Sequence, residues 1–321
     1  QSPANLPDPC QKGGTMFKKI LVATDTLSFC DVKVRTAAAI ALQHHAALHL
    51  LHVLESTSPI YRNFVKDFKT GEEILSTPEY QQTVKEALDR NCENVLKKCE
   101  AHEIETALGY PWEEILKRAR DKEAELIILG PHTGEAEQSG VVRASGSIGS
   151  TLQGVIRHAR CPVMIIQRPI PEEHLNFKKV MVCVDFSESC RCALEFAKKL
   201  SQRYGSRLFI FHTYTPSTAA EALPSASPAA AEAVMKKLEK FCGGIPATIP
   251  YTTHLAEGRE PYSEILKFAL DEDIQLIAMG SHTKEKAPKW HVGSAVEHVS
   301  LRAQCPVVVV TDPKALWRMG L

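Results

Sequence analysis

The sequence predicts an α/β protein made of two tandem, doubly wound parallel-sheet domains, and three observations support this prediction. Short, continuous apolar segments rich in β-branched residues alternate with amphipathic segments. This alternation occurs twice along the chain, with the same landmarks in the same order. Strands that are apolar on both faces need helices on both sides, which is typical of a parallel sheet with right-handed crossovers. The 321 residues are enough for two such domains.

The repeat is visible by eye. F-K-K-I at 17–20 and F-K-K-V at 177–180 each open a strand, and E-I-L-K at 114–117 recurs at 264–267. Two further pairs of landmarks are Gly-Ser at 149–150 and 293–294, and Cys-Pro-Val at 161–163 and 305–307. The predicted division of the chain is a disordered extension or tag at 1–15, domain 1 at 16–168, a linker at 169–176, domain 2 at 177–312 and a C-terminal tail at 313–321.

The elements of domain 2 follow from periodicity. The segment 180–184 is a β-branched strand, and Ala193, Phe196, Ala197 and Leu200 then recur at the spacing of one helix face. The elements that follow are a strand at 208–213, a helix around 234–241, a strand near 249–256, a helix around 265–269, a strand at 275–280, a helix from Ser294 and a last strand at 306–310. Domain 1 repeats this plan with a longer second helix. The sequence alone does not set the strand order.

Composition argues against several classes of function. Lys plus Arg equals Asp plus Glu at 38 each, so no basic surface for nucleic acid or an anionic membrane is expected. The longest uncharged stretch, 36–54, contains a glutamine and four histidines and does not read as a membrane span. We therefore expect a cytoplasmic protein. The ten cysteines form no C-x-x-C pair and are interpreted as core residues, with no metal site.

A nucleotide pocket is predicted where strand four of domain 2 ends. Gly280 closes that strand, and Gly293-Ser294 opens the next helix, whose free N–H groups and dipole favour a phosphate. Asp185, after strand one, is a carboxylate suited to a ribose hydroxyl. Each feature also has a purely structural interpretation: an N-cap for Gly-Ser, a turn for the Asp and a strand end for Gly280.

These residues resemble the motif of the ATP-binding universal stress proteins, G-x2-G-x9-G-[ST] after strand four with an Asp ending strand one. The resemblance covers both copies and implies the adenine nucleotide alpha-hydrolase-like fold. In domain 2 the spacing fits, with Thr283 in place of the second glycine. The nucleotide-binding residues that the resemblance implies in domain 2 are Asp185, Thr213, Met279, Gly280, Thr283, Gly293, Ser294 and Ala295.

Domain 1 is predicted to hold a weaker second site. Fifteen residues, 134–148, precede Gly149, six more than the motif allows. The extra loop carries Glu135 and Glu137, which would repel phosphate, whereas the loop of domain 2 carries three lysines, Lys284, Lys286 and Lys289. The matching positions in domain 1 are Asp25, Val53, Gly130, Gly149, Ser150 and Thr151.

Two functions from different classes remain open at this point. The first is a cytoplasmic stress-response regulatory protein that binds ATP or a related adenine nucleotide, with Mg²⁺ as a companion of ATP. The alternative is a non-nucleotide interaction or scaffold module, or a small-ligand receptor, on the same fold. No combination of base, nucleophile and metal ligands is evident, so at most a slow ATPase is expected. By the resemblance, the last strands at 162–166 and 306–310 should pair within the chain, while a homodimer of chains stays open.

Overall fold

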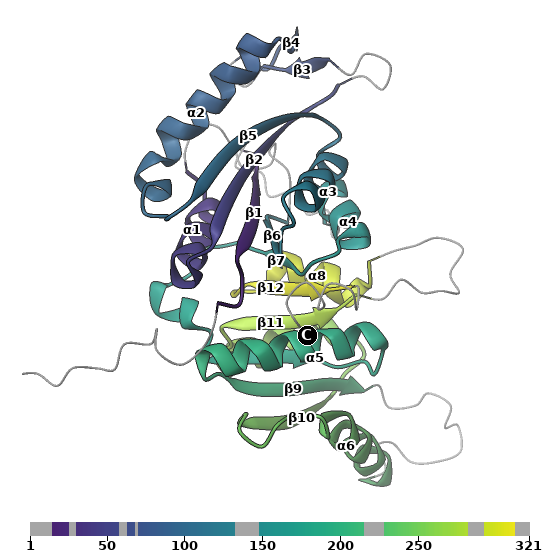
Figure 1. Ribbon diagram of the computed structural model, residues 1–321. Helices are drawn as coiled ribbons and strands as arrows, with labels where there is room; N and C mark the ends of the chain where they lie inside the picture. Colours follow the sequence, from purple (N-terminus) through teal and green to yellow (C-terminus); the bar gives the residue numbers. More distant parts are fainter. Residues whose placement is uncertain are drawn as a thin grey trace, which may run out of the picture.

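The computed structural model describes residues 15–25, 30–57, 63–67, 70–131, 148–214, 228–281 and 292–311. Within these ranges ten strands form one continuous sheet, and helices cover both of its faces (Figure 1). The order across the sheet is β10-β9-β8-β11-β12-β7-β6-β1-β2-β5. Each domain therefore has its strands in the order three-two-one-four-five, all parallel within the domain. The prediction of two doubly wound domains is confirmed.

Domain 1 follows the predicted alternation and adds one feature. Its elements are β1 (Lys19–Thr24), α1 (Val32–His44), β2 (Ala47–Glu55), β3 (Phe64–Lys66), β4 (Glu73–Leu75), α2 (Pro78–Leu96), β5 (His102–Gly109), α3 (Pro111–Asp121), β6 (Leu126–Leu129), α4 (Ser150–His158) and β7 (Val163–Ile165). The small β3–β4 hairpin between β2 and α2 is absent from the prediction. The carboxylate of Asp31 caps α1 by accepting the backbone N–H of Val34, which sets the start of the helix.

Domain 2 has the same plan, and its stretch 215–227, which corresponds to the hairpin region of domain 1, lies outside the described residues. Its elements are β8 (Lys179–Cys183), α5 (Glu188–Tyr204), β9 (Arg207–Tyr214), α6 (Pro228–Cys242), β10 (Tyr251–Glu257), α7 (Pro261–Asp271), β11 (Leu276–Gly280), α8 (Ser294–Arg302) and β12 (Val307–Val310). Ser187 caps α5, which starts one turn earlier than α1 does in its domain. The predicted linker at 169–176 contains a 3-10 turn, η2 (Glu172–Asn176), with Leu175 buried. Of the extension at 1–15 only Thr15 is described, and the tail at 313–321 lies outside the described residues.

Two hydrophobic cores lie on opposite faces of the sheet, and each runs through both domains. Helices α1, α2, α5 and α6 cover one core, and α3, α4, α7 and α8 cover the other. Alternate residues of β12 enter different cores, Val308 on the first face and Val309 on the second. This burial on both sides explains why the strands read as unbroken apolar runs in the sequence.

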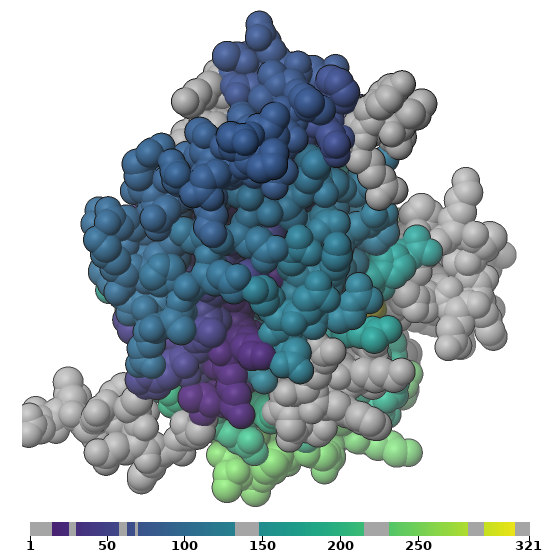
Figure 2. Space-filling model, turned by 45° about the horizontal axis from the view of Figure 1, so that its top comes forward, coloured from purple at the N-terminus to yellow at the C-terminus, as the bar shows by residue number. Residues whose placement is uncertain are grey.

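The last strands of the two domains meet at the centre of the sheet. β7 pairs antiparallel with β12, and Val308 lies opposite Met164. This pairing covers two apolar edges that would otherwise be exposed. Domain 1, in purple to teal, and domain 2, in green, pack against each other in the space-filling view (Figure 2). No described helix combines the length and the apolar character that crossing a membrane requires.

A buried polar contact joins α1 and α5 across the two domains. The imidazole of His44 is fully buried, with Nδ1 accepting the backbone N–H of Met16 at 3.2 Å. Its Nε2 lies 2.7 Å from the hydroxyl of Tyr204, which donates in turn to Oε1 of Gln43 at 3.2 Å. Since Nδ1 is an acceptor, Nε2 carries the proton and the ring is neutral. His44 and Tyr204 occupy equivalent positions in the two copies of the repeat, so each domain supplies a different half of the contact.

Candidate functional site

The winding of the sheet reverses between strands one and four of each domain. In domain 2 these strands are β8 and β11, which are direct neighbours, and in domain 1 they are β1 and β6. Ligands of open α/β sheets bind in the crevice at the carboxyl ends of such strands. Six predicted site residues of domain 2 gather at this edge at the ends of β8, β9 and β11 or the start of α8: Asp185, Thr213, Met279, Gly280, Gly293 and Ser294. Ala295 follows in the first turn of α8, and Thr283 lies outside the described residues.

Two buried hydroxyls at this edge of domain 2 have no hydrogen-bond partner among the described residues. They are Oγ1 of Thr213, in β9, and Oγ of Ser281, which follows β11. An unsatisfied buried hydroxyl costs about 1–3 kcal/mol, so an incoming ligand with polar atoms would recover that energy. The equivalent of Thr213 in domain 1 is Val53, which is half-buried against the core and offers no such group.

The two glycines of the predicted phosphate motif that the structure describes have different environments. A Cβ at Gly280 would lie 2.4 Å from the backbone nitrogen of Cys190 and from the carbonyl carbon of Ser189, so this glycine lets β11 pack directly on α5. A Cβ at Gly293 would meet no atom of the described residues within 4 Å, and its φ of −57° suits any residue. Local packing therefore explains Gly280 but gives no reason for glycine at 293.

Asp185 forms the turn that leads from β8 into α5. Its Oδ1 accepts hydrogen bonds from the backbone nitrogen of Ser187 at 2.9 Å and from the Ser187 hydroxyl at 2.6 Å. The same hydroxyl caps α5 by accepting from the backbone nitrogen of Cys190 at 3.2 Å. Phe186, which lies between Asp185 and Ser187, adopts a left-handed φ of 65°. The centroid of its ring lies 4.6 Å from that of His212. Asp185 therefore stabilises a turn, which is one of the two interpretations that the sequence allowed; the other is contact with a ribose hydroxyl.

The first-strand carboxylate of domain 1 is held by a lysine. Nζ of Lys33 lies 2.6 Å from Asp25 and 3.2 Å from Asp31, and Asp31 also accepts from the hydroxyl of Thr24 at 2.7 Å. Burial opposes the charge on Lys33, but the two carboxylates prevail and raise its pKa. A ribose would have to compete with Lys33 for Asp25. Lys33 is not among the predicted site residues, and its signal in the sequence is its position two residues after Asp31, the N-cap of α1. The equivalent residue in domain 2 is Ala193.

A repeated histidine ties strand two to strand one at the carboxyl edge of each domain. Nδ1 of His52 lies 2.9 Å from the carbonyl of Thr24, and Nδ1 of His212 lies 2.6 Å from the carbonyl of Val184. A carbonyl oxygen can only accept, so Nδ1–H of His52 is the donor, and burial lowers the pKa of the ring. In the sequence the two histidines are 160 residues apart, like the two F-K-K segments that open the domains. The role of the histidines is to fix the rim of the crevice.

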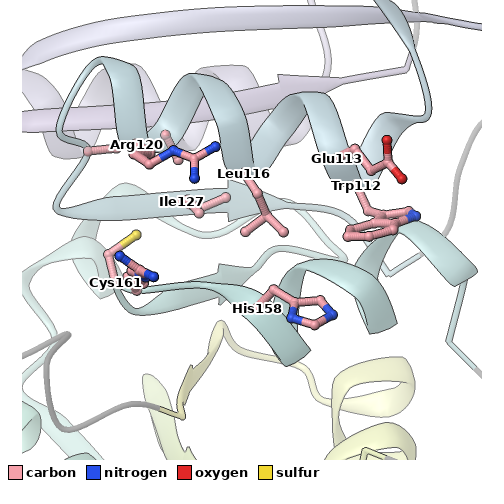
Figure 3. Close-up of a pocket in the computed structure, with 10 residues that line it drawn as sticks. Trp112, Glu113, Leu116, Arg120, Ile127, His158 and Cys161 are labelled. Carbon is pink, nitrogen blue, oxygen red and sulfur yellow. The ribbon is translucent and has the colours of Figure 1, made fainter.

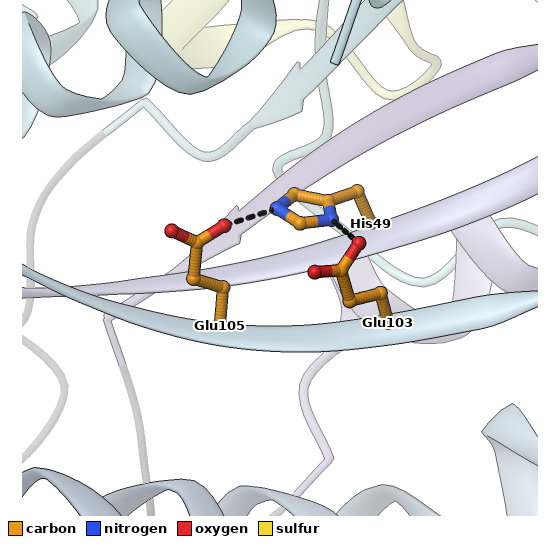
Figure 4. Close-up of side chains that lie close together, drawn as sticks. All are labelled: His49, Glu103 and Glu105. Carbon is orange, nitrogen blue, oxygen red and sulfur yellow. Dashed lines mark hydrogen bonds and ion pairs between the residues drawn. The ribbon is translucent and has the colours of Figure 1, made fainter. Parts of the chain in front are cut away.

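A second polar cluster lies on β2 and β5 of domain 1, at the amino-terminal half of the strands. Nδ1 of His49 is 3.3 Å from Glu103 and its Nε2 is 3.0 Å from Glu105 (Figure 4). The three side chains could offer ligand atoms to a metal ion. Both carboxylates already meet a cation, however, since Lys122 lies 2.7 Å from Glu103 and Arg118 pairs with Glu105. Burial lowers the pKa of His49 while the two carboxylates oppose that shift. We interpret the cluster as an ion-pair network.

Domain 2 replaces this network by an aromatic cluster at the same positions of the repeat. Phe268 lies 4.6 Å from His254 and 4.8 Å from Phe211, and Phe209 stacks on His254 at 5.8 Å. The two domains have therefore kept their backbone plan while the side chains on the α3 and α7 face have diverged. The charged residues of the two motif loops, Glu135 and Glu137 in domain 1 and Lys284, Lys286 and Lys289 in domain 2, lie outside the described residues.

Comparison with known proteins agrees with this architecture. The model of the universal stress protein family matches the chain twice, over residues 16–167 and 176–311. A universal stress protein encoded beside a sulfhydrylase gene of Thermus aquaticus is 29% identical over 145 residues, which are 42% of this chain and 98% of that protein. A universal stress protein of Methanocaldococcus jannaschii is 26% identical over 164 residues, or 48% of this chain and 96% of the relative.

Solved structures of similar proteins span nearly the whole molecule. The crystal structure of a universal stress protein from Archaeoglobus fulgidus covers 91% of this chain and 98% of its own, with a TM-score of 0.62 and 23% identity. A structure from Pseudomonas aeruginosa, described as functionally unknown, covers 95% of this chain with the same TM-score and 14% identity. At such identities the likeness concerns the fold alone.

Proposed function

Because the chain belongs to the universal stress protein family, we propose that it is a cytoplasmic stress-response regulatory protein that binds ATP or a related adenine nucleotide in domain 2. Family membership itself supports a stress-response protein of the adenine nucleotide alpha-hydrolase-like fold. The nucleotide and its place in domain 2 are inferred from the crevice at the carboxyl ends of β8 and β11.

The observation that carries the proposal is the buried hydroxyl of Thr213. Its Oγ1 lies at the carboxyl end of β9 without a partner among the described residues, and the same holds for Oγ of Ser281 one strand beyond β8. An adenine nucleotide offers ring nitrogens and ribose hydroxyls to such groups. A valine fits the same backbone position in domain 1, so packing alone does not require a hydroxyl there.

The start of α8 supports a phosphate position. Gly293 is the N-cap and makes no side-chain cap, so the first N–H groups of the helix are open to an anion. The space beside Gly293 is free of other described atoms within 4 Å. A phosphate can therefore approach the backbone closely, and ATP would bring Mg²⁺ with it as counter-ion.

Domain 1 offers a weaker site in this proposal. Lys33 forms a 2.6 Å ion pair with Asp25, so that carboxylate is already engaged. Val53, the equivalent of Thr213, has no hydroxyl to offer a ligand. These features favour the alternative function, a module that binds no nucleotide, for domain 1 alone. Any turnover of ATP would be slow, because the switch point of domain 2 presents no evident base beside a nucleophile among its described residues.

Calorimetry with ATP tests the proposal through one methyl-for-hydroxyl exchange in each domain. Thr213→Val should weaken binding about tenfold, since a net hydrogen bond is worth about 0.5–1.5 kcal/mol. The matched change Val53→Thr in domain 1 should leave the affinity unaltered. Wild-type protein that binds no adenine nucleotide, with none released from it on denaturation and mass spectrometry, would refute the proposal. An equal loss from both variants would refute its placement in domain 2.

Thr283 provides a second test at the motif position where the family has glycine. If its side chain crowds the phosphates, Thr283→Gly should raise the affinity for ATP, because glycine lets the backbone approach them. The measurement is the same titration, with Gly293→Asp as a variant expected to abolish binding and Gly149→Asp as its domain 1 control. A fall in affinity for Thr283→Gly would mean that the hydroxyl donates to the nucleotide.

A further inference from the structure

A groove with a volume of about 340 Å³ runs between α3 and α4 of domain 1 (Figure 3). Its floor is apolar, with Leu116 and Ile127 in the middle and Trp112 and His158 at one end. Arg120 marks the other end, next to Cys161. That end lies at the amino-terminal edge of β6 and β7. Because β7 is antiparallel to β12, this is the same edge of the sheet as the carboxyl ends of β8 and β11, but the groove is lined by residues of domain 1 alone. A volume of this size falls within the range of about 300–1,000 Å³ that is typical of small-molecule sites.

The charges along the groove are uneven. Arg120 and Arg160 line one end, both exposed to solvent, and neither forms an ion pair with another described residue. Glu113 lies at the opposite end, above Trp112. The field therefore favours an anionic group at the arginine end and disfavours a second one at the tryptophan end.

The second copy of the repeat shows that this groove is not a requirement of the fold. At the position of Ala124 domain 2 has Ile274, a larger side chain that is buried. At the positions of Arg120 and Arg160 it has Leu270 and Gln304, both uncharged. The same backbone plan is thus compatible with a filled floor and a neutral rim, and domain 1 has neither.

The tryptophan wall is held in place by its neighbours. Gly154 of α4 lies so close that a Cβ there would be 2.6 Å from the Trp112 ring. His158, one turn further along α4, stacks on the indole, with ring centroids 5.5 Å apart and planes inclined by 26°. An indole held against α4 by two contacts is pre-organised, which lowers the entropic cost of binding a ligand against it.

We propose that this groove binds a small amphipathic monoanion, a carboxylate or sulfonate joined to a short alkyl or aromatic body. The anionic group pairs with Arg120 and Arg160, and the body lies on Leu116 and Ile127 toward Trp112. Glu113 sets the orientation and selects against ligands charged at both ends. The site is separate from the nucleotide crevice and does not depend on nucleotide binding.

Octanoate is the probe, with octan-1-ol as its uncharged counterpart. Trp112 reports occupancy once the other two tryptophans of the chain are changed, Trp290→Phe and Trp317→Phe. Binding of octanoate should alter Trp112 emission in a saturable way, with one site per chain. Octanol should bind at least about tenfold more weakly, because it forms no charge-assisted hydrogen bond to the arginines.

The residues of domain 2 supply the variants. Ala124→Ile should abolish the response by filling the floor, and Arg120→Leu with Arg160→Gln should weaken octanoate at least about tenfold while leaving octanol unchanged. Arg157→Gln, an exposed arginine of α4 outside the groove, is the control and should have no effect. If circular dichroism shows that Ala124→Ile does not fold, the double variant of the two exposed arginines still tests the proposal.

Three results would overturn the proposal. They are no saturable response to octanoate up to the solubility limit, equal affinities for octanoate and octanol, and an unchanged affinity in the arginine double variant. Displacement of octanoate by saturating ATP would do the same, because it would place the probe in the nucleotide crevice. Failure of ATP to bind at all would leave the octanoate result intact and would count only against the proposed function.

Discussion

Replacing His44 by Gln should remove a pH-dependent part of the stability of the protein. His44 is fully buried between α1 and α5, accepts the Met16 N–H at Nδ1 and lies 2.7 Å from the Tyr204 hydroxyl at Nε2. A second proton on Nδ1 would face the Met16 N–H, donor against donor. Burial, with smaller contributions from Arg203 and His45, lowers the pKa of His44 from 6.5 to about 4.

The size of the effect follows from linkage. The folded protein binds fewer protons at His44 than the unfolded chain does between pH 6.5 and about 4, so the free energy of unfolding falls as the pH falls through this window. Each unit of pKa shift corresponds to about 1.4 kcal/mol, which gives about 3 kcal/mol when the window has been crossed. At pH 5 the loss is about 2 kcal/mol relative to pH 7.5, and below about pH 4 His44 adds no further loss.

Urea unfolding at pH 7.5 and pH 5 measures this loss directly. Wild-type protein should lose about 2 kcal/mol more than His44→Gln between the two pH values, because other buried histidines titrate equally in both proteins. Tyr204→Phe is the matched control: it removes the hydroxyl at all pH values but keeps the titrating ring, so its pH dependence should follow the wild type. Identical pH dependence of wild type and His44→Gln would refute the reasoning.

Two further predictions concern packing. Gly280→Ala should destabilise the protein by about 1–3 kcal/mol in thermal unfolding, since its Cβ would lie 2.4 Å from the backbone of α5. Gly293→Ala should cost far less, because no described atom lies within 4 Å of a Cβ at that position. Equal costs would contradict this account. Val308→Lys with Val309→Lys should separate β12 from β7, because both side chains are fully buried beside that strand pair. Limited proteolysis should then cut the linker at 169–176 while each domain stays folded, and a protected linker would show that β7 and β12 do not hold the domains together.

The fold could be predicted because its signals are local. The apolar runs before residues 25 and 185, the helix-spaced residues from Ala193 to Leu200 and the recurring Gly-Ser pairs each lie within a few residues of the chain. Duplication then repeated every signal, so two weak patterns supported each other. The same locality placed Asp185, Gly280 and Gly293 at one edge of the sheet, because the carboxyl ends of parallel strands lie together.

The tertiary structure alone decided which residues meet across elements. Residue 280 must be glycine because β11 packs directly on α5, ninety residues earlier in the chain. Lys33 pairs with Asp25 only because α1 starts one turn later than α5 does in its domain. His44 contacts Tyr204 only because β7 and β12 join the two domains. Such contacts depend on where helices begin and how they cross the sheet, which packing sets after the chain has folded back on itself. A sequence read along one dimension contains these partners but not their distances.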